Sequence, residues 1–554
     1  MNTKQEITKL CTDCKTEFTI NSGDLNLYEK VGLNIPKQCF ECRLKQYFVF
    51  WIFGKFRKGV SDLSGENLIT VLPNNAQYPI YTSHEWWSDI WEPMHYGQDY
   101  GPSRSFFDQL KELQKKIPRP HQTGENSVNC DWCDDVWESK NCYLARGILR
   151  CENLMYGQRV IDTKDSVDIV YSFNLQNSYD CLLCHNSFNL NFSENSKDCI
   201  DSYFLFDCRN CHNCFMCWNL RNKKYCIRNK QYTPEEYEKE LKRVKLDSHN
   251  SIETFKNEFQ NILKSEAVHR ENFNLKTTDS IGNYLTNCDE CTNVFCWENS
   301  QNCRNSLRGL NTKDCIDQLG CWNNEVSGNN SCVTGGYAIK HSSWSDGRYS
   351  EYLDLCSEVE YCFGCIGLRK KKYCILNKQY SKEEYEKLRN KIIEDMIVNE
   401  EYGKFLPYSM GICDYNLSNG IIYLPNVSKE EILEKGGYWS EEDLSSHEGM
   451  SSLELPDSIN DTDKEISMQA LICPESKYRF NISSAEYEFH KNKSFALPRL
   501  HFDTRILKKI KKTAVLKAYP YKCTFCGNDI MAYYPPEWNY QKIACEECYK
   551  QNIA

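Results

Sequence analysis

A repeat of twelve residues, which carries most of the chain's 33 cysteines, constrains the fold more than any other feature of the sequence. From Cys130 the chain divides into blocks such as CDWCDDVWESKN, CYLARGILRCEN, LMYGQRVIDTKD and SVDIVYSFNLQN, and the spacing resumes after a nine-residue block, SYDCLLCHN. The blocks end in Asn or Asp, and many have a second Asn or Asp three residues earlier. A fixed short period predicts stacked units that share a common core.

The residue types within the blocks favour short β-strands. Polar and apolar residues tend to alternate, aromatic and β-branched residues are frequent, and Asn or Asp separates the runs as a turn residue. We therefore expect a parallel β-solenoid. The spacing alone is compatible with twelve residues forming either a whole coil or half of one.

The repeat region occurs twice in tandem. KKYCIRNKQYTPEEYEKELKR (223–243) follows the first array, and KKYCILNKQYSKEEYEKLRNK (371–391) follows the second, looser array, whose clear blocks begin at Cys291, Cys303, Cys315 and Val359. Thr233 and Ser381 precede acidic first turns, so each array is expected to end in a capping helix. A further helix is expected at 106–117, before Pro118 and Pro120.

Composition limits the class of protein. A chain of 554 residues that is 40% hydrophobic has enough apolar residues for several globular cores. It has no apolar stretch of about 18 residues and no recognisable signal peptide, so we expect a protein with no membrane contact in a reducing, cytoplasmic location. The net charge of -10 argues against a protein that coats nucleic acid over its whole surface.

Residues twelve apart should lie above one another, which places thiols in columns such as Cys199/Cys211 and Cys291/Cys303/Cys315. Cysteine is a small apolar residue that suits a narrow solenoid core, and this is the simpler interpretation. The alternative is that some columns bind zinc or an iron–sulfur cluster. Its best case is the CxxCxxCxxC run Cys208–Cys217, which lacks the final spacing and the proline of ferredoxin motifs and has Val359 at one matching position of the duplicate.

Two complete four-cysteine sets lie near the ends of the chain. Each set consists of two CxxC pairs, and a CxxC turn supplies two thiolates to a tetrahedral zinc ion. Because all four ligands are cysteines, neither site leaves a position for water or substrate, so we expect two structural Zn²⁺ ions. The expected ligands are Cys11, Cys14, Cys39 and Cys42 in the first set, and Cys523, Cys526, Cys545 and Cys548 in the second.

The stretch LCTDCKTEFTINSGDLNLYEKVGLNIPKQCFECR resembles a small, probable zinc-ribbon domain of treble-clef type. The resemblance covers about 35 residues and implies that the four N-terminal cysteines bind zinc. The rest of the chain resembles cysteine-rich proteins of candidate-phylum bacteria, in segments such as EWWSDIWEPMHYGQDYG and YGKFLPYSMGICDYNLSNG. That second resemblance implies no activity.

A second copy of the N-terminal module is expected at 471–505. It aligns without gaps and places Cys473, Ser476, His501 and Thr504 on the four cysteine positions. Two of the four ligands are thus replaced by hydroxyl residues, which are poor zinc ligands. This copy is expected to hold no zinc and to persist as a packing or binding surface.

Basic and aromatic residues flank both zinc modules, at 43–58 and at ILKKIKKTAVLKAYPYK (506–522). Such flanks can contact phosphates and stack bases, whereas the plain alternative is that the aromatics form core and the lysines are solvated. The chain has no P-loop, GxGxxG, HExxH or GxSxG motif. His84, His121, His185 and His212 are expected to be structural, and Trp86, Trp87 and Trp91 are expected to be mostly core.

These observations predict an α+β multidomain protein with tandem twelve-residue β-solenoid-like repeats, helical caps and flanking treble-clef and zinc-ribbon modules. The expected function is a non-enzymatic, zinc-binding interaction scaffold with a protein partner; the alternative is nucleic-acid binding through the terminal modules, and a redox or metal-storage role comes third. The expected segments are 1–58 (treble clef), 59–128 (aromatic and helical connector), 129–270 and 271–400 (repeat units), 401–465 (connector), 466–518 (degenerate treble clef) and 519–554 (zinc ribbon).

Overall fold

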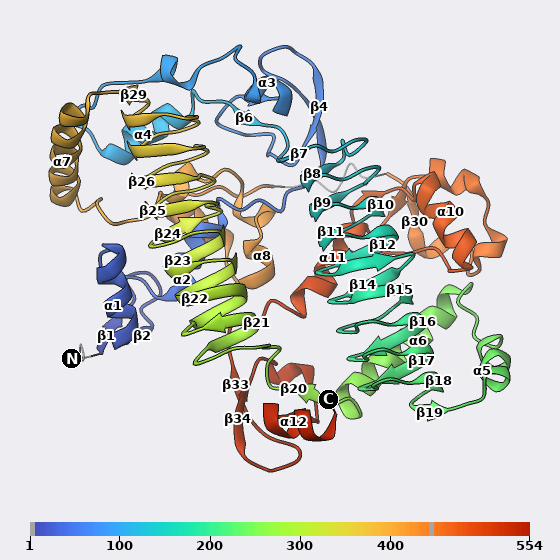
Figure 1. The fold of residues 1–554 in the computed structure, drawn as a ribbon. Helices are drawn as coiled ribbons and strands as arrows, with labels where there is room; N and C mark the ends of the chain where they lie inside the picture. Colours follow the sequence, from blue (N-terminus) through green and yellow to red (C-terminus); the bar gives the residue numbers. More distant parts are fainter. Residues whose placement is uncertain (1–5, 442–447, 554) are drawn as a thin grey trace. The chain divides into compact units, whose positions relative to one another are not determined.

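The computed structural model describes residues 6–441 and 448–553. The chain divides into two compact units: unit 1 comprises Met1–Gln122 and Asn272–Ser440, and unit 2 comprises Thr123–Glu271 and Glu441–Ala554. Each unit contains one β-solenoid, coloured teal in unit 2 and yellow-green in unit 1 (Figure 1). Each unit is therefore built from two stretches that are distant in the sequence.

The solenoid of unit 2 is a stack of parallel strands whose partners are twelve residues apart. Val167 pairs with Tyr179, and Tyr179 pairs with Asn191. Twelve residues therefore form one complete coil, and the nine-residue block in the sequence causes no interruption. The strands are β7 (Gly124–Glu125), β8 (Cys133–Trp137), β9 (Ala145–Leu149), β10 (Glu152–Met155), β11 (Gln158–Ile161), β12 (Lys164–Val170), β13 (Phe173–Gln176), β14 (Tyr179–Leu182), β15 (His185–Asn191), β16 (Ile200–Phe206), β17 (His212–Trp218) and β18 (Lys224–Ile227).

Within each coil, almost every third residue has a positive φ angle. Asn174 (54°) and Asn177 (53°) are examples, and the residues that follow them, Leu175 and Ser178, point into the core. A coil thus consists of four segments of three residues, each with one inward side chain. Asn and Asp tolerate the left-handed conformation better than other residues with a Cβ, which explains their recurrence at three-residue spacing.

Serine and cysteine at inward positions satisfy backbone groups inside the core. The Ser178 hydroxyl donates to the C=O of Gln176 (3.0 Å) and accepts from the N–H of Leu190 in the next coil (3.2 Å). The Cys181 thiol donates to the C=O groups of Tyr179 (3.5 Å) and Leu190 (3.2 Å). These bonds tie each coil to the next and explain why small residues with a donor fill the columns.

The solenoid of unit 1 has the same construction with two shorter steps, the first of which ends at Ile281, whose partner Thr292 is eleven residues on. Cys303 pairs with Cys315 at the usual spacing, but in the second short step Gly336 pairs with Gly347, again only eleven residues on. Gly347 has φ of 140°, and a Cβ there would lie 2.1 Å from the carbonyl oxygen of Val359, so this second short step requires glycine. The strands are β21 (Ile281–Asp289), β22 (Thr292–Leu310), β23 (Lys313–Trp322), β24 (Gly328–Ser331), β25 (Gly336–Lys340), β26 (Gly347–Glu351), β27 (Val359–Phe363) and β28 (Lys372–Ile375).

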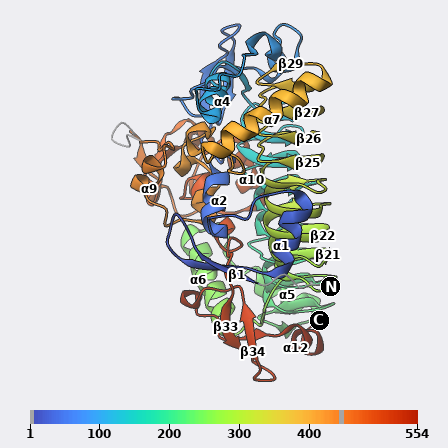
Figure 2. The same cartoon turned by 90° about the vertical axis from the view of Figure 1, so that its left-hand side faces the viewer.

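Both arrays end in a hairpin and a helix, which confirms the predicted caps. β19 (Lys230–Gln231) and β29 (Lys378–Gln379) run antiparallel to the last strands, and α5 (Pro234–Leu241) and α7 (Lys382–Val398) follow. Thr233 and Ser381 form capping boxes, the reciprocal side-chain caps of a helix N-terminus. α7 contacts β28 and lies in front of the solenoid of unit 1 in Figure 2.

The other elements of unit 1 pack around its solenoid, with two helices, α1 and α2, contacting β23. The elements are β1 (Ile7–Leu10), β2 (Glu17–Ile20), α1 (Ser22–Val31), α2 (Phe40–Phe48), β3 (Arg57–Val60), β4 (Asn67–Thr70), β5 (Ile80–Tyr81), α3 (Ser83–Trp87), α4 (Phe106–Gln114), β6 (Arg119–Pro120), α8 (Gly420–Tyr423), α9 (Lys429–Glu434) and the 3-10 helices η1 (Pro93–Tyr96), η2 (Tyr408–Met410) and η3 (Tyr415–Leu417). α4 confirms the helix predicted there, although it ends at Gln114 rather than at 117.

The other elements of unit 2 follow the same plan, with α11 contacting β12 and α6 contacting β16. They are α6 (His249–Ser265), β20 (His269–Arg270), β30 (Met450–Ser451), β31 (Leu471–Ile472), β32 (Arg479–Phe480), α10 (Ser484–Lys493), α11 (Phe502–Lys511), β33 (Tyr519–Lys522), β34 (Asp529–Ala532), β35 (Ile543–Ala544), α12 (Glu546–Asn552) and the 3-10 helices η4 (Ser452–Glu454), η5 (Ile459–Asp461), η6 (Lys464–Met468) and η7 (Pro536–Trp538). None of the helices in the described parts of either unit has the length and apolar character needed to cross a bilayer.

Candidate metal centres

Four cysteines converge at one end of the N-terminal module (residues 7–48). Cys11 and Cys14 lie in the turn between β1 and β2, Cys39 is the N-cap of α2, and Cys42 lies in its first turn. Their Sγ atoms all lie within 4.8 Å of one another, and those of Cys14 and Cys39 are 3.7 Å apart. Four thiolates around zinc, with Zn–S of about 2.3 Å, stand about 3.8 Å from one another. The spacing therefore suits a tetrahedral ion.

Backbone hydrogen bonds hold this site in shape. The N–H of Cys11 donates to the C=O of Thr16 (2.9 Å), and Lys15, with φ of 62°, closes the turn by donating its N–H to the C=O of Cys11 (3.1 Å). The N–H of Cys39 donates to Sγ of Cys11 (3.3 Å). A hydrogen bond with Cys42 lowers the pKa of the Cys39 thiol to about 7. This bond favours the thiolate form of Cys39, the form in which cysteine binds a metal.

The C-terminal module (residues 519–552) brings together the second set. Cys523 and Cys526 lie between β33 and β34, Cys545 is the N-cap of α12, and Cys548 follows in its first turn. The four Sγ atoms again lie within 4.8 Å of one another, with 4.0 Å between those of Cys526 and Cys545. All eight cysteines singled out in the sequence thus stand in two groups of four.

The C-terminal site has its own N–H donors. The N–H of Cys545 donates to Sγ of Cys523 (3.4 Å), and the N–H of Cys548 donates to Sγ of Cys545 (3.5 Å). Burial raises the pKa of the Cys523 thiol, but the N–H groups of Cys526, Cys545 and Phe525 outweigh this effect and lower the pKa to about 6. The thiolate of Cys523 is therefore favoured near neutral pH.

The N-terminal site is attached to the solenoid of unit 1 through the residue next to Cys42. The Arg43 guanidinium donates to Asp317 in β23 (2.7 Å), and the Tyr28 hydroxyl donates to the other oxygen of the same carboxylate (2.7 Å). Asp13, in the first CxxC turn, forms an ion pair with Lys435. The sequence does not predict these contacts, because they join segments hundreds of residues apart; the aspartate within CTDC is the only local signal.

The predicted copy of the N-terminal module has the same turn in the structure. The N–H of Cys473 donates to the C=O of Tyr478 (2.9 Å), and Lys477, with φ of 63°, donates its N–H to the C=O of Cys473 (3.1 Å). Sγ of Cys473 lies 4.0 Å from Oγ1 of Thr504, and Nδ1 of His501 accepts the N–H of Asp503 (3.1 Å). The His501 ring is therefore engaged in capping α11.

The copy is also docked like the original. Arg505 forms a buried ion pair with Asp168 in β12 (2.6 Å), just as Arg43 does with Asp317. The inward residues two positions before these aspartates are Ser166 and Cys315. Each of them stands five coils before the last cysteine of its array, Cys226 in unit 2 and Cys374 in unit 1. The module and its docking site were therefore duplicated together.

The solenoid thiols do not form a further metal group. The Cys211 thiol, in the CxxCxxCxxC run, donates to the C=O groups of Arg209 (3.4 Å) and Leu220 (3.6 Å). Within residues 6–441 and 448–553, only the two terminal sets bring three or more potential ligands within 4.8 Å of one another. The run is part of the buried core, as the simpler interpretation of the thiol columns predicts.

Lysines in the basic and aromatic flanks of the two modules form ion pairs with nearby carboxylates. Lys509 forms an ion pair with Asp180 (2.6 Å), and Lys508 and Lys512 are paired with Glu475 and Glu194. Three of the four lysines in the run are thus paired with carboxylates of unit 2, which leaves the choice between phosphate contact and a solvated face untested. At the other flank the aromatic residues Tyr47, Phe48 and Trp51 are buried, and Lys45 pairs with Glu431.

Two of the histidines and two of the tryptophans singled out in the sequence hold structural positions. Nδ1 of His121 accepts the N–H of Ser83 (3.0 Å), and the ring of His185 stacks on Phe173 with 4.8 Å between centroids. Burial lowers the pKa of His185 to about 4. The indoles of Trp86 and Trp91 are buried and donate to C=O groups, whereas Trp87 is 49% exposed.

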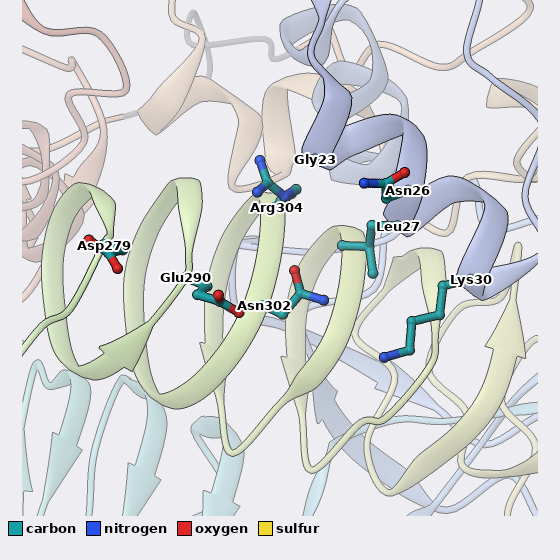
Figure 3. Close-up of a pocket in the computed structure, with 8 residues that line it drawn as sticks. All are labelled: Gly23, Asn26, Leu27, Lys30, Asp279, Glu290, Asn302 and Arg304. Carbon is teal, nitrogen blue, oxygen red and sulfur yellow. The ribbon is translucent and has the colours of Figure 1, made fainter. Parts of the chain in front are cut away.

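A polar groove of about 410 Å³ lies between α1 and the first coils of the unit 1 solenoid (Figure 3). Gly23, Asn26, Leu27 and Lys30 of α1 line one side of it, and Asp279, Glu290, Asn302 and Arg304 of the solenoid line the other. Acidic and basic groups balance in this lining, and it includes no cysteine, serine or histidine. The groove therefore offers no nucleophile with an adjacent base.

Comparison of the chain with protein-family models and with curated proteins gives no match.

Proposed function

We propose that this protein is a non-enzymatic interaction scaffold whose N-terminal treble clef and C-terminal zinc ribbon each hold one structural Zn²⁺ ion. The observation that carries the proposal is the convergence of two four-cysteine sets at the spacing of a tetrahedral thiolate site. When bound, the ion would cross-link two turns that the chain otherwise joins by a few hydrogen bonds, such as those from the N–H of Thr12 to the C=O of Lys37 (3.0 Å) and from the N–H of Thr524 to the C=O of Ile543 (2.8 Å). A site with four thiolates leaves no place for water or substrate, so its role is structural.

The two solenoids supply the surface of the scaffold. Their cores are closed by serine, cysteine and aliphatic side chains, while residues with positive φ angles project outward from every coil. Repeat arrays of this kind present extended surfaces and commonly act by binding other proteins. All 33 cysteines lie in the described parts of the chain and none of them forms a disulfide, which supports a reducing location such as the cytoplasm.

Metal analysis of the purified full-length chain tests the proposal. We expect two zinc ions per chain by elemental analysis and native mass spectrometry, and one ion in each of the variants Cys39→Ser and Cys523→Ser. Loss of a structural zinc removes on the order of 10 kcal/mol from a small module, so each variant should gain protease cleavage within its own module only.

Cys473→Ser is the matched control, because this buried cysteine belongs to the copy that lacks a complete ligand set. It should keep both zinc ions. Purified protein without zinc, or with iron and sulfide in its place, would contradict the proposal.

A further inference from the structure

Residues 57–87 of unit 1 have the same backbone plan as the C-terminal module of unit 2. In both segments two four-residue antiparallel strands, β3–β4 and β33–β34, are joined by six residues. The N–H of Ser61 donates to the C=O of Glu66 (2.8 Å), as that of Cys523 does to Asn528 (2.8 Å). Gly65 and Gly527 then close the turns, with φ of 76° and 74°.

The second halves of the two segments also correspond. The N–H of Asp62 donates to the C=O of Ile80 (2.9 Å), and the Asp62 side chain accepts the N–H of Ile80 in return (2.6 Å). Thr524 and Ile543 exchange the same two bonds, at 2.8 and 2.9 Å. β5 pairs in parallel with β6, and β35 pairs in parallel with β20. In the chain, β5 is followed directly by α3, and β35 is followed directly by α12.

The helix caps complete the match. Thr82 is the N-cap of α3, and its Oγ1 accepts the N–H of Glu85 (3.2 Å); Cys545 is the N-cap of α12, and its Sγ accepts the N–H of Cys548 (3.5 Å). When the two segments are aligned by these matching hydrogen bonds, four residues of unit 1 take the positions of the four cysteines of the C-terminal site. Ser61 and Ser64 correspond to Cys523 and Cys526, and Thr82 and Glu85 correspond to Cys545 and Cys548.

We infer that residues 57–87 are a metal-free copy of the C-terminal module, in which the Glu85 carboxylate, held by hydroxyl groups at the other ligand positions, replaces the metal ion. The inference rests on the proposed function in so far as the C-terminal set binds zinc. This segment, expected only as a connector, joins the solenoid of unit 1 through Arg369, which donates to the C=O of Trp86 (2.9 Å). The C-terminal module joins the solenoid of unit 2 in a similar way, through Arg221, which donates to the Tyr549 hydroxyl (3.0 Å).

The contacts of Glu85 explain why this site needs no ion. Its Oε2 accepts the Ser61 hydroxyl (2.5 Å) and the N–H of Thr82 (2.8 Å), and the side chain is 6% exposed. Burial raises the pKa of Glu85, but hydrogen bonds from Ser61, Ser64 and Thr82 outweigh it and lower the pKa to about 2. The carboxylate therefore links the same two turns that zinc would link, with oxygen acceptors and hydroxyl donors in place of four Zn–S bonds.

Each unit thus combines one four-cysteine module with one metal-free module. In unit 1 residues 7–48 carry the cysteines and 57–87 do not, whereas in unit 2 residues 519–552 carry them and 471–511 do not. Chelation should therefore open one module in each unit and leave the other docked on its solenoid.

The test exchanges the two sets of side chains in the full-length chain. The variant Ser61→Cys/Ser64→Cys/Thr82→Cys/Glu85→Cys should bind three zinc ions where the wild type binds two, as counted by native mass spectrometry. A folded variant that still binds two ions would overturn the inference. So would wild-type protein that binds Mg²⁺ or Ca²⁺ at Glu85, because the carboxylate would then be a cation ligand.

The reciprocal variant Cys523→Ser/Cys526→Ser/Cys545→Thr/Cys548→Glu decides the matter if the first fails to fold. It should bind one zinc ion and keep residues 519–552 resistant to protease in the presence of EDTA. Cleavage as fast as that of Cys523→Ser would refute the equivalence. Wild-type protein without any zinc would instead count against the proposed function, so the two failures are distinguishable.

Discussion

At the scale of single residues, the solenoid depends on the repeated use of the left-handed conformation. Asn141 has φ of 53°, and its side chain bonds to Asn129 (2.9 Å) and Asn153 (3.1 Å) in the neighbouring coils. Other residue types also occupy such positions, for example Glu138, exposed and with φ of 48°. Because a Cβ makes this conformation costly for most residues, the identity of the side chain at these positions should affect stability in a regular way.

We predict that Asn141→Ala lowers the free energy of unfolding by about 1 to 2 kcal/mol and that Glu138→Asn raises it by up to about 1 kcal/mol. Urea unfolding monitored by circular dichroism measures both changes. Asn141→Gly is the control, since glycine adopts positive φ freely and should cost less than alanine. Equal effects of Ala and Gly would show that the backbone conformation is not the cause.

The inward cysteines make a second prediction at this scale. Cys214 stands in a column with Ser202, whose hydroxyl donates to Ile200 (2.8 Å) and accepts the N–H of Cys214 (3.1 Å). Cys214→Ser can repeat this pattern toward the N–H of Cys226, so it should be tolerated better than Cys214→Ala, which should cost about 1 to 2 kcal/mol through lost packing. Thermal unfolding gives the order, and zinc content should stay unchanged. A loss of metal from either variant would revive the cluster interpretation.

At the scale of elements, the sequence predicted the capped arrays and the turn of the copy at 471–505, because these depend on local spacing and on N-cap residues such as Thr233. It did not predict the three-residue segments, although Asn and Asp at three-residue spacing were the visible signal. Nor did it predict the relation of 57–87 to 519–552. In residues 57–87 two of the four cysteine positions hold serine and the others hold threonine and glutamate, so the sequence of this segment has no CxxC motif.

The metal-free module should respond to acid through Glu85. Its pKa falls from the ordinary 4.5 to about 2 in the folded protein, so its contribution to stability is complete above about pH 5 and is lost as pH falls toward 2. The protection of residues 57–87 against hydrogen exchange, relative to the rate of an unstructured peptide at the same pH, should therefore fall over this range, and Glu85→Gln should have lost it already at pH 6. Measurements in EDTA remove the effect of zinc loss elsewhere. Protection of the wild type that stays constant over this pH range would contradict the assignment.

At the scale of the whole molecule, each compact unit joins a solenoid to modules encoded far away in the chain. Asp317 and Asp168 receive Arg43 and Arg505 from segments hundreds of residues distant. Contacts of this kind carry no local pattern, which is why the sequence predicted the modules but not which solenoid each one joins. For the same reason the sequence did not predict the acidic partners of Lys508, Lys509 and Lys512, which lie in the repeats or, for Lys508, in the copied turn.

This arrangement bears on the nucleic-acid alternative. With Lys508, Lys509 and Lys512 already paired to carboxylates, few phosphate contacts remain to be made by this segment. We therefore expect no association with single-stranded RNA or DNA at 150 mM salt in fluorescence anisotropy, by the usual salt dependence of phosphate contacts. Tight, salt-sensitive binding that is abolished by replacing these lysines with glutamate would favour the nucleic-acid role over the scaffold.

The four-sided coil also sets the step in which these arrays can change length during evolution. Removal of twelve residues deletes one whole coil and leaves every remaining side chain in its own column. Removal of three keeps each inward residue inward but turns everything beyond it by a quarter of a revolution, which moves a docking aspartate such as Asp168 to another wall. Insertions and deletions in homologous arrays should therefore occur in multiples of twelve residues, that is, in whole coils. Losses of a single residue should be confined to turns where a glycine adopts a positive φ angle, as at Gly347.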